Sequence, residues 1–195
     1  MKRTLLLLCL LLFSHVTRAD DWQTPSVQRA ALALSRRAMT HYFATGTTLT
    51  LPRDVPSALR KRGALFVTIE KQGQIQPRGC RGTIRPNFAT IGDEIIRNSL
   101  AALTRDATQP PLRRDELARC RISLTLVQRV SPIQNPAQSS EEFGLVARAG
   151  ERWGVVLPYE GRDQTTRAAW ARRKAGLPSS AAVEWLELRA VRFRE

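Results

Sequence analysis

Two hydrophobic periods divide the chain into predicted helices and strands. Helical spacing begins at Thr24-Pro25, a threonine N-cap followed by proline at the first helical position. Apolar residues then recur every three to four positions up to Gly46, which places them on one buried stripe. The same spacing, with capping residues at its start, predicts a second helix over 90–106 and a third over 163–175.

Alternation between apolar and polar residues predicts strands with one buried face. The predicted strands are 63–70, 121–130, 144–148, 153–157 and 183–194. Lys71-Gln72-Gly73 predicts a hairpin turn, from which 74–78 returns beside the first strand. Residues 131–140 are polar and contain prolines, so they are predicted to form a loop.

The order of these elements indicates the fold class. Helices and strands follow one another in mixed order, and hairpins connect neighbouring strands, which is typical of an α+β fold. We therefore expect an antiparallel sheet with flanking helices. The 195 residues are enough for one domain with a hydrophobic core.

The first residues have the three-part pattern of a secretory signal peptide. Lys2 and Arg3 precede the apolar run 4–13, and Thr17-Arg18-Ala19 follows as the small-residue exit. The run is shorter than the roughly 20 apolar residues that span a bilayer, so cleavage after Ala19 is expected rather than a membrane anchor. The sequence therefore predicts a signal peptide over 1–19 and an exported protein, periplasmic or secreted. Its mature part, 20–195, forms a single domain without a membrane span.

The chain is strongly basic. Its formal net charge is +14, and removal of Lys2, Arg3 and Arg18 with the signal peptide lowers that charge to +11. Such a charge is typical of proteins that bind nucleic acid, anionic lipid or acidic small molecules. The arginines are spread along the chain and are not clustered with aromatic residues, so nucleic-acid binding is not expected.

The segment 76–84, QPRGCRGTI, is the main candidate for a functional site. Its glycines permit positive φ and would expose successive backbone N–H groups, and its arginines add fixed positive charge. This combination favours a small anionic ligand or a partner segment. Alternatively, the glycines form a bulge or turn at a sheet edge and the arginines are solvated. The candidate ligand-binding residues are Arg78, Gly79, Cys80, Arg81 and Gly82.

Cys80 is also a candidate catalytic residue. Neighbouring arginines favour the thiolate and would lower the pKa of an exposed thiol. A thiol enzyme needs a base, and His41 and Glu70 are the candidates. Cys120 could instead close a disulfide with Cys80, because sequence does not fix the distance between their Cα atoms. Cysteine and histidine spacings match no zinc site, and no cofactor is identified.

Several segments resemble a known family. The segments 63–68, GALFVT, and 77–84, PRGCRGTI, resemble the signature region of the AMMECR family, whose hallmark is a Leu-Arg-Gly-Cys-Ile-Gly hexamer after a hairpin strand. The resemblance covers 26–195. Further segments in the family's order are Arg105-Asp106, Pro110-Pro111-Leu112, the strand at 121–126 and Lys174-Ala-Gly-Leu.

The resemblance implies an α+β fold in which a larger and a smaller lobe surround a cleft, with the Arg-Gly-Cys loop as the functional site. Related proteins are also grouped as protein A of the AmmeMemoRadiSam system. That grouping implies Memo-like and radical SAM companion proteins and an accessory role. Four hexamer positions match, whereas Pro77 stands where leucine is usual and Arg81 where isoleucine is usual.

Together these patterns predict a binding or accessory module that holds a small anionic ligand or a partner segment at the Arg-Gly-Cys loop. The alternative is a thiol-dependent enzyme in which Cys80 is the nucleophile.

Overall fold

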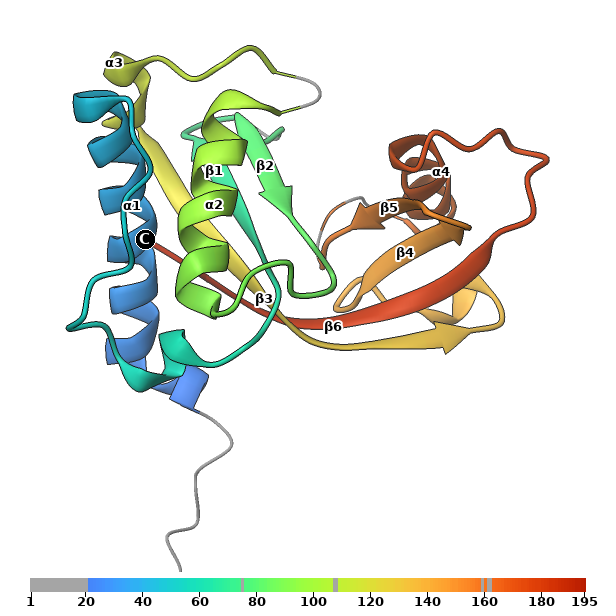
Figure 1. The fold of residues 1–195 in the computed structure, drawn as a ribbon. Helices are drawn as coiled ribbons and strands as arrows, with labels where there is room; N and C mark the ends of the chain where they lie inside the picture. Colours follow the sequence, from blue (N-terminus) through green and yellow to red (C-terminus); the bar gives the residue numbers. More distant parts are fainter. Residues whose placement is uncertain (1–20, 75, 107–108, 159, 161–162) are drawn as a thin grey trace, which may run out of the picture.

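The computed structural model describes residues 21–74, 76–106, 109–158, 160 and 163–195 (Figure 1). Three short 3₁₀ turns, Asp21–Gln23, Ser57–Arg60 and Pro136–Gln138, accompany the main elements. In chain order, these elements are α1 (Pro25–Thr45), β1 (Leu65–Lys71), β2 (Gly79–Gly82), α2 (Ile91–Thr104), α3 (Arg114–Leu117), β3 (Cys120–Ile133), β4 (Gly144–Ala149), β5 (Arg152–Val156), α4 (Gln164–Lys174) and β6 (Glu184–Arg194).

The described strands form one antiparallel sheet in the order β2-β1-β3-β6-β4-β5, which confirms the predicted α+β fold with flanking helices. The first half of β3 pairs with β1, and the first half of β6 pairs with β4. The register between β3 and β6 shifts between Val127 and Arg129. Such a bulge bends a strand and increases its twist. The sheet therefore curls, and its β1–β2 and β4–β5 ends form two walls (Figure 1).

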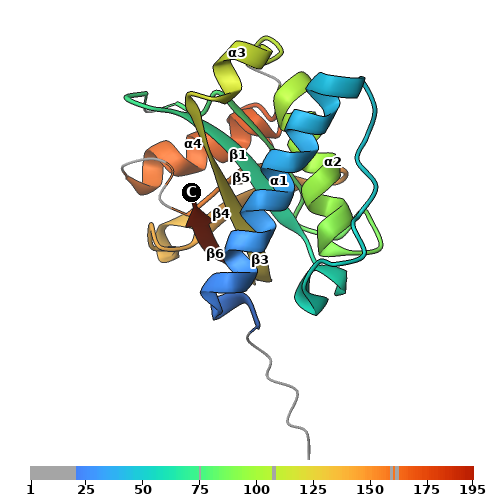
Figure 2. The ribbon, with the colours of Figure 1, turned by 90° about the vertical axis from the view of Figure 1, so that its left-hand side faces the viewer.

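The alternation of side chains along β6 shows which face the helices cover. Phe193 belongs to the hydrophobic cluster of α1 and α2, and Trp185 to the cluster of α4. Both residues have odd positions in an unbroken strand, so they point to the same side of the sheet. Leu186 and Leu188 point to the opposite, inner side. The helices thus cover the outer face, and Figure 2 shows α1 across the sheet with α2 beside it.

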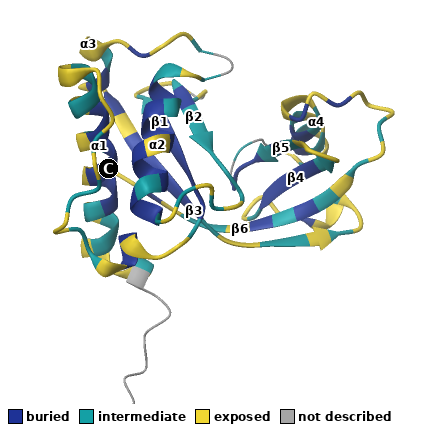
Figure 3. Cartoon of the chain, viewed as in Figure 1, coloured by how far each residue is buried: buried dark blue, intermediate teal, exposed yellow. Residues whose placement is uncertain are grey.

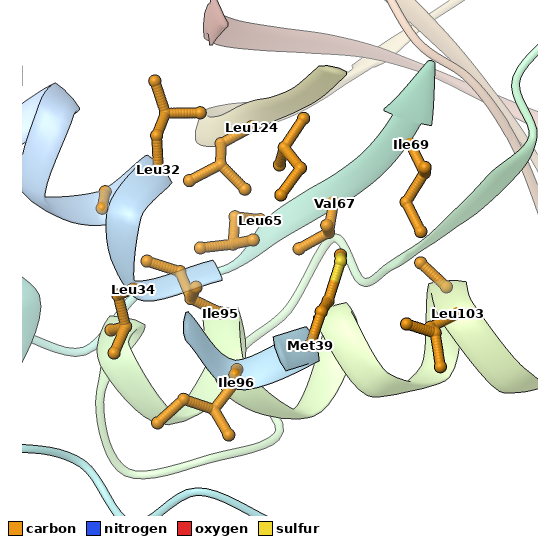
Figure 4. Close-up of a cluster of buried hydrophobic side chains, with 14 of the residues drawn as sticks. Leu32, Leu34, Met39, Leu65, Val67, Ile69, Ile95, Ile96, Leu103 and Leu124 are labelled. Carbon is orange, nitrogen blue, oxygen red and sulfur yellow. The ribbon is translucent and has the colours of Figure 1, made fainter. Parts of the chain in front are cut away.

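The larger lobe contains α1, α2, β1, β2 and the first half of β3, and its core lies between the helices and the sheet. Met39, Val67 and Ile95 are completely buried there (Figure 4). The smaller lobe contains β4, β5 and α4, and its own cluster packs beneath Ala171. In Figure 3, the buried residues of α1 and α2 follow the sides that face the sheet, as the helical periodicity predicts.

The ends of the helices follow the sequence closely. Gly46 adopts φ 71°, and its N–H donates to the Tyr42 carbonyl at the end of α1. Thr90 caps α2 by accepting a hydrogen bond from the Asp93 N–H at 3.1 Å. Glu94, in the first turn of α2, is completely buried and accepts backbone N–H groups of the preceding loop. This carboxylate fixes the path by which the chain enters α2.

Three segments differ from the prediction. The strand β3 continues to Ile133, beyond 130, because β6 supplies a pairing partner for its polar end. The returning strand begins at Gly79 instead of 74, since pairing with β1 starts at that residue. The short helix α3 was not predicted, because it has a single turn and therefore no hydrophobic period.

Candidate functional site

A cavity of about 490 Å³ opens on the inner face of the sheet, between the two lobes. One wall comes from β1, β2 and the end of α2, and the other from the end of β5 and the end of α4. The larger lobe thus supplies the Arg-Gly-Cys segment. The lining residues are Phe66, Pro77, Cys80, Arg81, Gly82, Asp106, Val155, Leu157, Glu160, Arg173 and Lys174.

Gly79 and Gly82 are required for close packing, not for an unusual backbone conformation. Neither has a positive φ, so the expected nest of exposed N–H groups does not form at these positions. A Cβ atom on Gly79 would lie 2.2 Å from the carbonyl oxygen of Ala102 in α2. On Gly82 it would lie 2.4 Å from the Cα atom of Phe66 in β1. The two glycines therefore let β2 approach α2 and β1.

Cys80 is half-buried on β2, with its thiol toward the cavity. Its Sγ atom lies 3.4 Å from the hydroxyl of Thr68, and its backbone N–H donates to Asp106 Oδ2 at 2.8 Å. Burial raises the pKa of the Cys80 thiol to about 11, although the hydrogen bond from Thr68 opposes this shift. The thiol is therefore protonated at neutral pH, contrary to the lowered pKa that the neighbouring arginines predict.

The proposed partners of Cys80 lie elsewhere. Cys120 is a free thiol in the core on the outer side, and β1 separates its strand from β2. Two strand spacings are about 9.5 Å, too far for a disulfide. His41 lies on α1 beside Thr47, with its Nε2 atom 3.1 Å from the hydroxyl oxygen. Neither residue lines the cavity, so the structure does not bring a thiol–imidazole pair together.

Arg78 points away from the cavity and holds the segment before α3. Its guanidinium donates to both carboxylate oxygens of Glu116, at 3.1 and 3.0 Å. It also donates to the carbonyl oxygens of Pro110 and Pro111. Only 10% of the Arg78 side chain is exposed, and its positive charge is balanced by Glu116 in this bidentate ion pair.

The Arg78–Glu116 pair gives a pH-dependent prediction. The hydrogen bond from Arg78, followed by that from the Arg113 N–H, lowers the pKa of Glu116 from 4.5 to about 2. Because the folded pKa is below the unfolded one, the stabilisation is complete above about pH 4.5 and is lost as the pH falls toward 2. We expect Glu116→Gln to lower the free energy of unfolding by about 1.5 kcal/mol at pH 7.

Urea unfolding of the wild type and of Glu116→Gln between pH 2 and pH 7 measures this difference. Asp115→Asn is the matched control, because Asp115 pairs with Arg113 at the exposed surface, where ion pairs contribute little. A Glu116→Gln difference that persists unchanged at pH 2 would contradict the ion-pair explanation.

Three cations from both lobes line the cavity with two carboxylates. Arg81 donates its Nε–H to the carbonyl oxygen of Arg105, the C-cap of α2, at 2.7 Å. Lys174 lies 2.8 Å from Glu160 Oε2. Arg173 lies over the ring of Trp170, with no polar partner among the described residues. Its N–H donors are therefore available to an anion in the cavity.

Glu70 lies in a second cavity on the same inner face, about 380 Å³ in volume. Pro77, Leu157 and Glu160 line both cavities and separate them. Burial opposes ionisation of Glu70, but hydrogen bonds from Ser123 and Arg192 outweigh it and lower its pKa. A carboxylate held in this way is a poor base for a thiol. Among the described residues, no three His, Cys, Asp or Glu side chains are grouped closely enough to bind a metal ion.

Sequence reasoning did not assign Asp106, Glu160, Arg173 or Lys174 to the site. They follow Cys80 by 26 to 94 positions, and only the curled sheet brings them near it. Asp106 and Lys174 fall in segments that resemble the AMMECR family. The family resemblance could therefore have pointed to these two residues as part of the site. Nothing in the local sequence distinguishes Glu160 or Arg173.

Comparison with known proteins identifies relatives along most of the chain. A profile of the AMMECR1 family matches residues 32–195. A protein from Thermotoga maritima is 32% identical over 147 residues, which cover 73% of this chain and 83% of the relative. A protein from Thermofilum pendens is 29% identical over 167 residues, covering 76% of this chain and 78% of the relative.

A solved structure has the same fold. The crystal structure of the uncharacterized protein PH0010 from Pyrococcus horikoshii superposes with a TM-score of 0.77 at 23% sequence identity. The match covers 87% of this chain and 92% of that chain.

The comparisons overturn the predicted localisation. Export to the periplasm or the medium is wrong, because the archaeal and bacterial relatives show no sign of a signal peptide. The expected signal peptide, 1–19, lies outside the described residues and precedes the family match, which begins at residue 32. Within the part of the chain that the structure describes, no helix has the length and apolarity to cross a membrane.

Proposed function

The chain belongs to the AMMECR1 family, and from this premise we propose that it is a binding or accessory module that holds a small anionic ligand between its lobes. The main support for this proposal is that three cationic side chains line one cavity beside Cys80: Arg81 from β2, and Arg173 and Lys174 from α4. A volume of about 490 Å³ is within the usual range for small-molecule sites.

Electrostatics favours an anion in this cavity. Glu160 is paired with Lys174 and also accepts the Leu157 N–H at 2.8 Å. Asp106 accepts the backbone N–H groups of Cys80 and Gln109. Both carboxylates thus have partners already, whereas Arg173 has no ion-pair partner within the part of the chain that the structure describes. An anionic group beside Arg173 would gain charge-assisted hydrogen bonds.

The protonated Cys80 thiol supports binding more than nucleophilic catalysis. A thiolate is the reactive form of cysteine, and the buried thiol with a pKa of about 11 is almost entirely neutral at pH 7. In the proposed role, Cys80 forms part of the cavity wall, and Asp106 fixes its backbone. Memo-like and radical SAM companion proteins remain a proposal that follows from the family resemblance.

Titration with citrate and with inorganic phosphate, followed by backbone amide chemical shifts, tests the proposal. We expect saturable shifts at Cys80, Arg81 and Gly82. Arg173→Gln should weaken citrate binding about tenfold, because one charge-assisted hydrogen bond contributes about 1.5 kcal/mol. Cys80→Ser should bind normally.

Arg129→Gln is the matched control, since it removes the same charge from an exposed residue of β3 that does not line the cavity. Equal weakening by Arg173→Gln and Arg129→Gln would attribute the effect to net charge. Loss of binding in Cys80→Ser, with its fold intact, would favour the thiol-dependent alternative.

A further inference from the structure

A larger cavity lies along α1, apart from the two cavities on the inner face of the sheet. It is an open groove of about 850 Å³, bounded by α1, the connector after it and the end of β6. Its apolar lining comes from Leu32, Ala33, Ala44 and Leu49. Ala33 and Ala44 are exposed, so the floor is accessible, and their small side chains leave the groove unfilled.

Two arginines, Arg29 and Arg37, line this apolar groove without a compensating partner among the described residues. Arg29 and Arg37 are eight positions apart on α1, about 12 Å along the helix axis. Arg194 also borders the groove at the end of β6, but its charge interacts with Glu70 and helps to lower the pKa of that carboxyl. Arg36 also lines it, but Glu195 neutralises that charge through a bidentate pair. The groove therefore combines an apolar floor with an excess of positive charge.

We propose that this groove binds a small amphipathic carboxylate, whose apolar body covers the alanine floor of α1 and whose carboxylate pairs with Arg29 or Arg37. The volume fits a single small molecule. A nucleic-acid backbone fits poorly, because the floor is apolar and the described lining residues include no tryptophan, tyrosine or phenylalanine on which bases could stack. The site is independent of the cavity at Cys80, because α1 lies on the outer face of the sheet and Cys80 on the inner face.

Decanoate and decanol are the probes, because they share an apolar chain and differ in charge. In the full chain, decanoate below its micelle concentration should shift the backbone amides of Ala33, Thr40 and Leu49. Decanol should bind at least fivefold more weakly. The double variant Arg29→Gln/Arg37→Gln should weaken decanoate about fivefold, as expected for loss of a partly exposed ion pair of about 1 kcal/mol, and leave decanol unchanged.

Two further variants separate the groove from general effects. Ala44→Glu places a carboxylate on the exposed floor without touching the core, and it should abolish decanoate binding while thermal unfolding stays cooperative. Arg129→Gln should leave decanoate binding unchanged. The proposal is overturned if neither probe shifts the groove amides, if decanol binds as tightly as decanoate, if decanoate shifts only the Cys80 segment, or if only acidic peptides bind.

Discussion

Gly79→Ala is expected to lower the free energy of unfolding by about 3 kcal/mol. The new Cβ atom would lie 2.2 Å from the Ala102 carbonyl oxygen, and this neighbour is helix backbone that cannot rotate away. Either α2 or β2 must move, and α2 also packs against α1 in the main core. A shift of β2 would also displace Cys80 and Arg81, so ligand binding should weaken together with stability.

Urea unfolding at pH 7 measures this loss, and Gly73→Ala provides the matched control. Gly73 has φ 78° and no atom within 4 Å of an added Cβ, so its substitution costs only backbone strain, about 1 kcal/mol. Gly79→Ala should therefore be clearly more destabilising than Gly73→Ala. The reverse order would show that the approach of β2 to α2 is loose and that Gly79 serves another purpose.

The helices and strands with a regular hydrophobic period could be predicted, because the polarity of each side chain indicates whether that position is buried or exposed. The stripe on α1 and the alternation in β1 follow from burial on one face. Two features of β3 could not be predicted in this way. Its bulge and its polar second half exist because β6, which follows roughly 60 positions later, pairs with them. Such pairing depends on long-range register, which a local period does not contain.

The candidate site was predictable only in part, for a related reason. The segment around Cys80 is recognisable from residue types, but the environment that sets the thiol pKa is not. Burial raises the pKa of the Cys80 thiol, and the neighbouring arginines do not lower it as expected. Arg78 pairs with Glu116, and Arg81 donates to the end of α2. The positive charge that remains available in the cavity comes from α4, in the other lobe.

Alkylation of Cys80 by iodoacetamide is expected to be about 100-fold slower than that of an unperturbed thiol at pH 7.5. Only the thiolate reacts, and a pKa of about 11 in place of 9.0 reduces its fraction by this factor. The rate should rise about tenfold per pH unit up to pH 10, without a plateau. Mass spectrometry of the peptide that contains Cys80 follows this residue separately from Cys120.

Thr68→Val tests the cause of the reactivity, because it removes the hydroxyl that opposes the shift and preserves the side-chain shape. Its alkylation should be slower still, while the same protein unfolded in urea should react at the ordinary rate. A plateau below pH 8 in the wild type would mean that a thiolate is stabilised in the cavity. In that case, Cys80 would be poised as a nucleophile, and the binding module would have to be reconsidered as a thiol-dependent enzyme.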